Sequence, residues 1–242
     1  MGGAALVRHE PHDAKIRQIF GDIAQVYDPM NRVITLGQWG RWQRRFLALV
    51  APAEGERCLD LATGTGDLAI MMAQVQPGMH VVGLDLSREM LAVAERKIAS
   101  VGLAGRVYVV EGNALALPFP DASFDLVTCG FGLRNFPDLP QALREMRRVL
   151  RPGGRALSLE VSRPTNGLTF FGFKLFFYGL VPLLGRLVGR AGAAYAWLPE
   201  SHRRFPGRAA LAELYRAAGF ERVAAWPLTM GAVAIHRGVA AK

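Results

Sequence analysis

The sequence predicts an α/β fold built on a doubly wound, mainly parallel sheet with helices on both faces. Apolar runs that suit buried strands alternate with amphipathic helical segments from residue 57 to residue 162, a pattern typical of parallel sheets with crossover helices. A glycine-rich turn joins the first strand directly to a helix. The 242 residues, 51% of them hydrophobic, suffice for one large domain with its own core. We therefore expect a single domain over residues 1–242.

The first 50 residues precede this alternation and are expected to form a helical cap. Apolar and polar residues alternate at helical spacing over residues 14–26 and again over residues 40–50, and Pro52 ends the second pattern. Residues 163–205 interrupt the alternation later in the chain and are expected to form an apolar lid insertion.

Across the whole chain the apolar segments predict seven strands. Strands are expected at residues 57–62, 80–86, 106–112, 124–130, 154–162, 221–228 and 231–238. Helices are expected at residues 66–75, 88–102, 140–150 and 208–220.

The turn after the first strand, "LDLATGTGDLA", indicates a nucleoside site. Gly64 and Gly66 allow close approach of the backbone to a ligand, and the following helix offers unpaired N–H groups. Asp85 ends the second strand, 19 residues after Gly66, where an acid would bind both ribose hydroxyls. The run from Gly64 to Ala69 also fits a dinucleotide fingerprint, so a nicotinamide-dependent oxidoreductase stays an alternative.

Acidic residues beside the glycine turn favour a cationic ligand. Asp60 and Asp67 flank the turn, and their charges would repel a pyrophosphate but suit an ammonium and a sulfonium. Asn113 and Ala114 follow the third strand, where an adenine amino group needs an acceptor. We therefore expect S-adenosyl-L-methionine as the cofactor, with Asp60 near its amino-acid end.

The charge and the cysteines restrict the partners. A net charge of +9, with 25 arginines among 29 basic residues, suggests an anionic partner. We see no basic, aromatic platform outside the expected fold, which argues against nucleic acid. Cys58 and Cys129 lie in apolar runs, so we expect buried thiols and no metal site. The N-terminus shows no signal-peptide core, so we expect a cytoplasmic protein.

Three stretches resemble signatures of the ubiquinone/menaquinone biosynthesis C-methyltransferases. They are "YDPMNRVITLGQWGRW" at residues 27–42, "GFGLRNFPD" at 130–138 and "RVLRPGGRALSLEVS" at 148–162. The resemblance covers roughly residues 19–238 and implies a Rossmann-like class I methyltransferase with a seven-stranded sheet. It further implies C-methylation of a demethylated polyprenyl quinol, demethylmenaquinol first and the ubiquinone precursor as a second substrate. Another small molecule or RNA stays open as the methyl acceptor.

The resemblance also implies roles for individual residues. Cofactor contacts would fall on Thr65, Asp85, Asn113 and Ala114, while the residues themselves add Asp60, Gly64 and Gly66. Gly130 stands near the cofactor where many members have Ser, and Trp39 stands where the family usually has His. Tyr27 and Asn31 would close over the substrate ring.

Arg134 and Asn135 are, with Tyr27, the candidate catalytic residues. They follow the fourth strand, at the sheet edge where ligands bind. A neutral quinol carbon is a poor nucleophile, and a phenol has a pKa of about 10, so an enzyme must favour the phenolate. A guanidinium beside the hydroxyl does this, and Arg134 would also bind substrate. Alternatively, Arg134 pairs with Asp28 or Asp138 and only braces the loop.

The insertion suggests a membrane contact. Residues 167–189 are rich in phenylalanine and about long enough to span a bilayer, but Lys174, Pro182 and Arg186 argue against spanning. We expect a lid over the active site that is either buried or also dips into an anionic interface on the inner face of the cell membrane; in the second case Phe173 and Phe177 would reach lipid. A homodimer contact through this segment is compatible with the same pattern.

Overall fold

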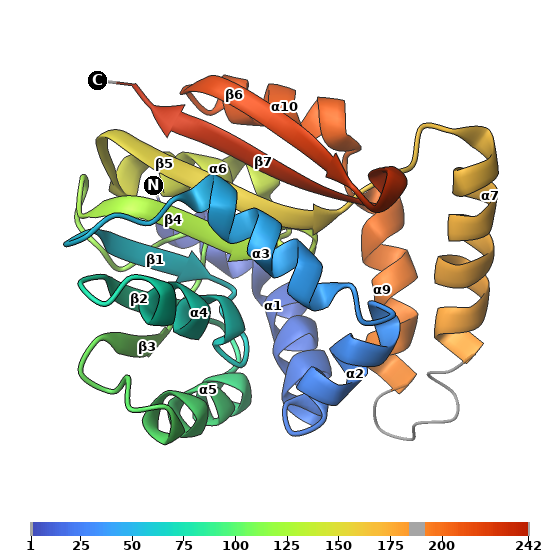
Figure 1. Ribbon diagram of the computed structural model, residues 1–242, viewed down its shortest axis with the longest axis horizontal. Helices are drawn as coiled ribbons and strands as arrows, with labels where there is room; N and C mark the ends of the chain where they lie inside the picture. Colours follow the sequence, from blue (N-terminus) through green and yellow to red (C-terminus); the bar gives the residue numbers. More distant parts are fainter. Residues whose placement is uncertain (1, 184–191, 242) are drawn as a thin grey trace.

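The computed structural model describes residues 2–183 and 192–241, so the part of the expected lid at residues 184–191 lies outside the described residues. Its centre is a seven-stranded sheet in the order β3-β2-β1-β4-β5-β7-β6 (Figure 1). Only β7 runs antiparallel to its neighbours within the described chain. The expected α/β fold with a mainly parallel sheet is confirmed.

The strands follow the predicted order closely. They are β1 (Arg57–Leu61), β2 (His80–Asp85), β3 (Val107–Glu111), β4 (Phe124–Gly130), β5 (Leu150–Val161), β6 (Phe220–Leu228) and β7 (Val233–Ala240). The largest difference is the start of β5, which begins four residues before the predicted 154 and includes the "RPGG" turn. Pairing of Phe124 with Leu150 across a bulge extends the strand through this turn.

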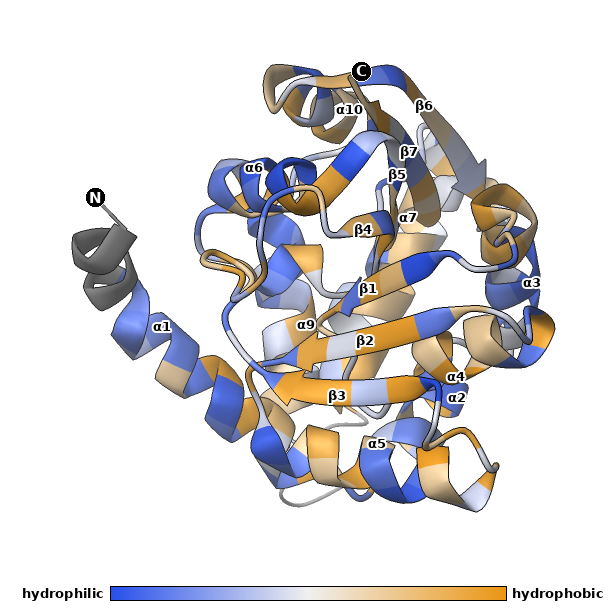
Figure 2. Cartoon of the chain, turned by 90° about the vertical axis from the view of Figure 1, so that its left-hand side faces the viewer, coloured by the Kyte–Doolittle hydropathy of each residue, from blue (hydrophilic) through white to orange (hydrophobic). Residues whose placement is uncertain are grey.

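Helices cover both faces of the sheet. On one face, α6 (Leu139–Val149) and α10 (Arg208–Ala217) pack against alternate strand residues such as Leu59 and Val127. On the other face, α3 (Trp39–Val50), α4 (Asp67–Val75) and α5 (Arg88–Ser100) pack against residues such as Cys58 and Leu126. Figure 2 shows the contrast between the largely hydrophobic β3 and the largely hydrophilic outer side of α6. Side chains alternate between faces along each strand, which explains why both layers are apolar.

The N-terminal helices differ from the expected cap. The first helix, α1 (Gly2–Ile23), begins before the predicted residue 14 and runs through Pro11. A short helix, α2 (Tyr27–Ile34), contains the "YDPMN" stretch. Phe46 and Val50 of α3 are fully buried in the core, so α3 belongs to the layer on the sheet.

The lid segment stands at the carboxyl ends of the strands, beside α1 and α2 (Figure 1). It contains α7 (Gly167–Lys174), the π-helical turn η2 (Leu175–Leu180) and α9 (Gly192–Arg204). Ile16 and Ile19 of α1 pack with Val181 and Trp197 of the lid in a separate apolar cluster. None of the helices within the described residues is long and apolar enough to cross a membrane.

Candidate active site

Two adjoining cavities open at the carboxyl ends of the parallel strands. The first, here called the cleft, has about 650 Å³ of space including its mouth and is lined by the loops after β1 to β4 and by α1. The second, here called the chamber, has about 1320 Å³ and is lined mainly by apolar residues of α2, α3, α7 and η2. Tyr27 and Phe131 line both cavities, so they form the wall between them.

Asp85 and Gly64 face each other across the floor of the cleft. The Gly64 N–H donates to Oδ2 of Asp85 at 2.8 Å, and the Ser87 N–H donates to Oδ1 at 2.9 Å. A carboxylate has about four acceptor positions, so two stay available for a ligand diol. Burial raises the pKa of Asp85, although these backbone N–H groups lower it in part. Gly64 has φ of +56°, a conformation that favours glycine, as the sequence predicted for a tight approach.

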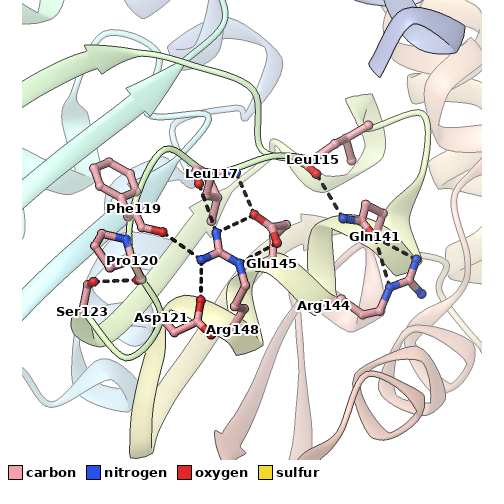
Figure 3. A network of polar contacts seen from close by, with 10 residues as sticks. All are labelled: Leu115, Leu117, Phe119, Pro120, Asp121, Ser123, Gln141, Arg144, Glu145 and Arg148. Carbon is pink, nitrogen blue, oxygen red and sulfur yellow. Dashed lines mark hydrogen bonds and ion pairs between the residues drawn. The ribbon is translucent and has the colours of Figure 1, made fainter. Parts of the chain in front are cut away.

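Asn113 and Ala114 line the cleft from the loop after β3. The loop that follows them is fixed to α6 by the network in Figure 3. Arg148 donates to the carbonyl oxygens of Leu117 at 3.0 Å and Phe119 at 2.8 Å, and Glu145 accepts from the Leu117 N–H at 2.7 Å. This bracing holds the loop backbone in one place, so the cleft end is preorganised.

Asp60 lies below the cleft and does not line it. Its carboxylate, 1% exposed, accepts from the hydroxyls of Thr63 at 2.7 Å and Thr128 at 2.6 Å. Burial raises the pKa of Asp60 to about 6, and the two hydroxyls oppose this rise. The structure therefore differs from the expected contact near the amino-acid end of the cofactor: Asp60 supports the turn from beneath.

Thr65 and Gly66 also do not line the cleft. The Thr65 hydroxyl donates to Asp28 of α2 at 2.6 Å. Lys97 of α5 pairs with Asp28 at 2.7 Å and with Asp67. Gly66 has φ of +81° and caps α4. This cluster connects the glycine turn to the N-terminal helices, which explains why these polar residues recur beside the turn without facing a ligand.

Gly130 lines the cleft, and its missing side chain has a steric reason. A Cβ at this position would lie 2.5 Å from Cδ1 of Leu68. Leu68, 5% exposed, fills the space that a side chain would take. Gly130 therefore lets Leu68 pack against the strand and provides no hydroxyl contact to the cleft.

Arg134 and Asn135 diverge into the two cavities. They lie in a 3₁₀ turn, η1 (Leu133–Asn135), where successive side chains point about 120° apart. Arg134 lines the chamber and Asn135 lines the cleft. Sequence adjacency thus places one residue on each side of the dividing wall.

Arg134 pairs with Glu160 of β5, not with Asp28 or Asp138. Its Nη1 lies 2.5 Å from Oε1 of Glu160, and the side chains are 5% and 1% exposed. Nη1 also donates to the Phe131 carbonyl at 2.6 Å. Nε is buried without a partner, and Nη2 makes no hydrogen bond to the described residues. The guanidinium is therefore held in place with donors left over.

Asn135 is held from two sides. Its Oδ1 accepts from Nε1 of Trp197 at 2.9 Å, and its carbonyl oxygen lies 2.8 Å from Nε2 of His12. The lid and α1 therefore orient this residue, and only its amide N–H₂ group is left for a ligand.

The wall between the cavities contains a residue that sequence reasoning missed. Phe131 has φ of +57°, which is costly for a residue with a side chain. Its ring packs 5.7 Å from Trp39 and 5.9 Å from Trp42, centroid to centroid. Trp39 also donates to Asp67 at 3.2 Å. The sequence signal that could have identified Phe131 is its place as an aromatic residue between two glycines, in "GFG".

Tyr27 and Asn31 occupy successive turns of α2 and both line the chamber, as expected of residues near a substrate ring. Burial raises the pKa of Tyr27, while Asn31 and Arg134 lower it in part. The phenol therefore stays protonated near neutral pH and can donate a hydrogen bond.

The charge of the cleft limits its ligand. Among the described residues that line it, Asp13 and Asp85 are acidic and no Lys, Arg or His occurs. A pyrophosphate would meet no cationic partner, whereas a nucleoside with a cationic tail would be stabilised. Cys58 and Cys129 are buried thiols, and the described residues contain no His, Cys, Asp and Glu group suited to a metal ion.

Asp60 gives a pH-dependent prediction. Because its pKa is raised in the folded state to about 6, its contribution to stability is full below the unfolded value and is lost as pH rises through 6. Asp60→Asn, which cannot ionise, should therefore gain about 1 kcal/mol relative to the wild type between pH 5 and pH 8. Urea unfolding of both proteins at the two pH values measures this; a constant difference would show that Asp60 does not titrate there.

Comparison with known proteins identifies the family of this chain. The ubiE/COQ5 methyltransferase family matches residues 8–240. The demethylmenaquinone methyltransferase of Geobacillus kaustophilus is 43% identical over 95% of this chain and 98% of its own length. That of Thermus thermophilus is 46% identical over 91% and 99%.

A solved structure extends the comparison to the fold. The crystal structure of a SAM-dependent methyltransferase from Aquifex aeolicus superposes with a TM-score of 0.60 at 18% identity, covering 82% of this chain and 89% of that one. At this identity the likeness concerns the fold, and it is the fold predicted from the alternating strands and helices. On the sequence match over nearly its whole length, the chain belongs to the ubiE/COQ5 methyltransferase family.

Proposed function

We propose that this protein transfers a methyl group from S-adenosylmethionine to a ring carbon of a demethylated polyprenyl quinol, with demethylmenaquinol as its substrate. The observation that carries the proposal is the pair of adjoining cavities, one acidic and one apolar, separated by Tyr27 and Phe131. The relatives named demethylmenaquinone methyltransferase support a naphthoquinol as the methyl acceptor.

The cleft fits S-adenosylmethionine by its chemistry. Asp85 retains acceptor positions for a ribose diol, and the acidic lining suits a cation. Bound there, the cofactor supplies an electrophilic methyl group on a good leaving group. The protein's own contribution is to hold the two reactants in line and to exclude water, which lowers the entropic part of the barrier.

The chamber side supplies the activation of the acceptor ring. Arg134 presents its unpaired donors from a buried position, where a hydrogen bond to a quinol oxygen favours the ionised form and raises electron density on the neighbouring carbon. Glu160 reduces the net charge of this group, so the effect depends on directed donors more than on charge alone. Tyr27 donates a second hydrogen bond and Asn31 lies one helical turn further along the chamber.

The volume and apolar lining of the chamber suit an isoprenoid tail. Phe173, Phe176 and Phe177 line it from the lid, and Leu36 and Met230 line it near the surface, where they are 68% and 74% exposed. The Tyr178 hydroxyl lies 2.6 Å from Nδ1 of His202, which joins η2 to α9 within the lid. A tail would thus leave the chamber between apolar side chains.

The proposal is tested with purified protein, S-adenosylmethionine carrying a deuterated methyl group, and reduced demethylmenaquinone. Mass spectrometry should detect a labelled methyl group on the naphthoquinol ring. A demethylated ubiquinone precursor and total RNA serve as competing acceptors. Labelling of RNA alone, or of neither quinol, would overturn the proposed substrate.

We also propose that the outer face of the lid rests on an anionic membrane. Leu168, Phe171 and Leu175 are 83%, 66% and 67% exposed and fall at helical spacing on one side of α7 and η2. Leu36 and Met230, which line the chamber, are exposed as well. The net charge of +9 adds attraction to acidic headgroups, about 1 kcal/mol for each basic residue near the surface. The bilayer would then deliver the substrate to the chamber.

The structure corrects which phenylalanines reach lipid. Phe177 is 5% exposed and stacks on Phe173 with ring centroids 5.0 Å apart, and both line the chamber. Phe177 is therefore buried rather than free to insert into a membrane, and half-buried Phe173 packs on it at the chamber wall.

Inner and outer variants should separate these roles. Phe171→Ser with Leu175→Ser should reduce co-sedimentation with anionic liposomes and spare turnover of a short-tailed quinol in detergent. Phe173→Ser with Phe177→Ser should leave liposome binding near wild type and impair a long-tailed quinol most. Absence of liposome binding by the wild type, with dimers seen by light scattering, would instead make the outer face a subunit contact.

A further inference from the structure

The end of the cleft beyond Asp85 carries a buried carboxylate from a distant helix. Asp13 of α1 lines the cleft and is 2% exposed. It lies against the loop after β3, where Nδ2 of Asn113 donates to its Oδ2 at 2.8 Å. Nothing in the local sequence around Asp13 resembles a nucleotide site, so only the tertiary structure brings it there.

The amide of Asn113 is already committed to protein partners at both ends. Its Oδ1 accepts from the Leu115 N–H at 2.9 Å, and its amide group donates to Asp13. Both ends of the amide are therefore engaged, and their orientation is fixed because a backbone N–H needs the oxygen and a carboxylate needs the nitrogen. The fixed amide leaves one lone pair of Oδ1, whereas the carboxylate beside it offers more acceptor positions.

Asp13 has more free acceptor positions than Asn113. The Asn113 amide is its one hydrogen-bond partner among the described residues. Burial raises the pKa of Asp13, while His12, Arg17 and the Asn113 amide lower it in part. A buried carboxylate with one hydrogen bond is costly unless a further donor approaches it.

The order of Asp85 and Asn113 along the cleft indicates which ligand group would donate a hydrogen bond to Asp13. Asp85, at the end of β2, is placed for the ribose, and the loop after β3, the next strand of the sheet, carries Asn113. A base attached to that ribose on this side would bring its edge toward Asp13. Adenine offers an amino group at this edge, whereas hypoxanthine offers a carbonyl oxygen.

We propose that Asp13 accepts a hydrogen bond from the exocyclic amino group of the cofactor's adenine, and that Asn113 orients Asp13 for this contact. The α1 helix thereby takes part in cofactor specificity. The proposal rests on the cofactor assignment above, and its test keeps the two separable.

Calorimetry with S-adenosylhomocysteine and S-inosylhomocysteine tests the contact without turnover. The wild type should bind the adenosyl ligand at least tenfold more tightly, since a hydrogen bond to a charged group is at stake. Asp13→Asn should weaken the adenosyl ligand about tenfold or more and leave the inosyl ligand unchanged or improved. The improvement is expected because a carboxamide can donate to the 6-oxo group.

Asp22→Asn is the matched control, because Asp22 is an exposed acid on the same helix; it should change neither affinity. If Asp13→Asn weakens both ligands equally, or leaves the preference for the adenosyl ligand unchanged, the role of Asp13 is overturned while the cofactor assignment still holds. Failure of the wild type to bind either ligand would overturn it together with the cofactor assignment. Dissociation constants refer to folded protein only, so partial loss of folding does not obscure the ratio.

Discussion

Arg134→Ala should destabilise the folded protein by about 3–5 kcal/mol and abolish turnover. The side chain of Glu160 is 1% exposed and pairs with Arg134 at 2.5 Å, so removing the guanidinium leaves a buried carboxylate without its counterion. The same change removes the donors that Arg134 presents to the chamber. Stability and activity are therefore both lost, and the single variant cannot separate bracing from chemistry.

A double variant separates them. Arg134→Met with Glu160→Gln removes both charges, and the single amide oxygen of Gln keeps an acceptor for one of the two backbone N–H groups, of residues 134 and 161, that Glu160 now binds through separate oxygens. Replacing both partners of a buried pair is often nearly neutral, so urea unfolding should return close to wild type. Turnover at saturating cofactor should stay lost. Recovery of turnover with stability would show that Arg134 only braces the loop.

Arg134→Lys provides the graded comparison. Lysine keeps the charge but loses the planar fork that serves Glu160, the Phe131 carbonyl and the chamber together. We expect intermediate stability and a turnover well below wild type. Cofactor affinity should change little in all three variants, because Arg134 does not line the cleft.

Local patterns predicted the features that local chemistry determines. The alternation of apolar runs fixed the strands within a few residues, and the glycine turn with Asp85 located the cleft. The sequence assigned Asp60 and Thr65 to the ligand side, but their side chains face elsewhere. For Asp60 the alternation of side chains along β1 decides the direction, and for Thr65 it is the turn with positive φ at Gly64 and Gly66. A difference of one residue in that assignment moves a carboxylate from the cleft to the core.

Pairings between distant segments could not be predicted. Glu160 follows Arg134 by 26 residues and Asn113 follows Asp13 by 100, and only the sheet order and the path of α1 bring each pair together. The direction of Phe173 and Phe177 depends in the same way on packing of α7 and η2 against His202 of α9. Membership of a methyltransferase family decides against the nicotinamide alternative, in agreement with a cleft whose described lining has no basic residue.

Asp85→Ala should weaken S-adenosylmethionine binding by about 1.5–3 kcal/mol, or roughly 10- to 150-fold. The variant loses the acceptors for the ribose diol and also frees the Gly64 N–H that Asp85 holds at 2.8 Å, so the glycine turn becomes less ordered. The affinity of Asp85→Asn for S-adenosylmethionine should lie between those of the wild type and Asp85→Ala, because its one amide oxygen can still accept from a single backbone N–H.

Glu111→Ala is the matched control for Asp85→Ala. Glu111 is the register partner of Asp85 on β3 and also ends its strand, but it is exposed and pairs only loosely with Arg88, at 3.8 Å. Removing it changes the charge at the same sheet edge by the same amount, so any general electrostatic effect on a cationic cofactor should appear in both variants. Calorimetry should show a loss confined to Asp85→Ala, with circular dichroism confirming that both proteins are folded. Equal losses in the two variants would mean that the edge attracts the cofactor by its overall charge, and that Asp85 makes no directed contact with the ribose.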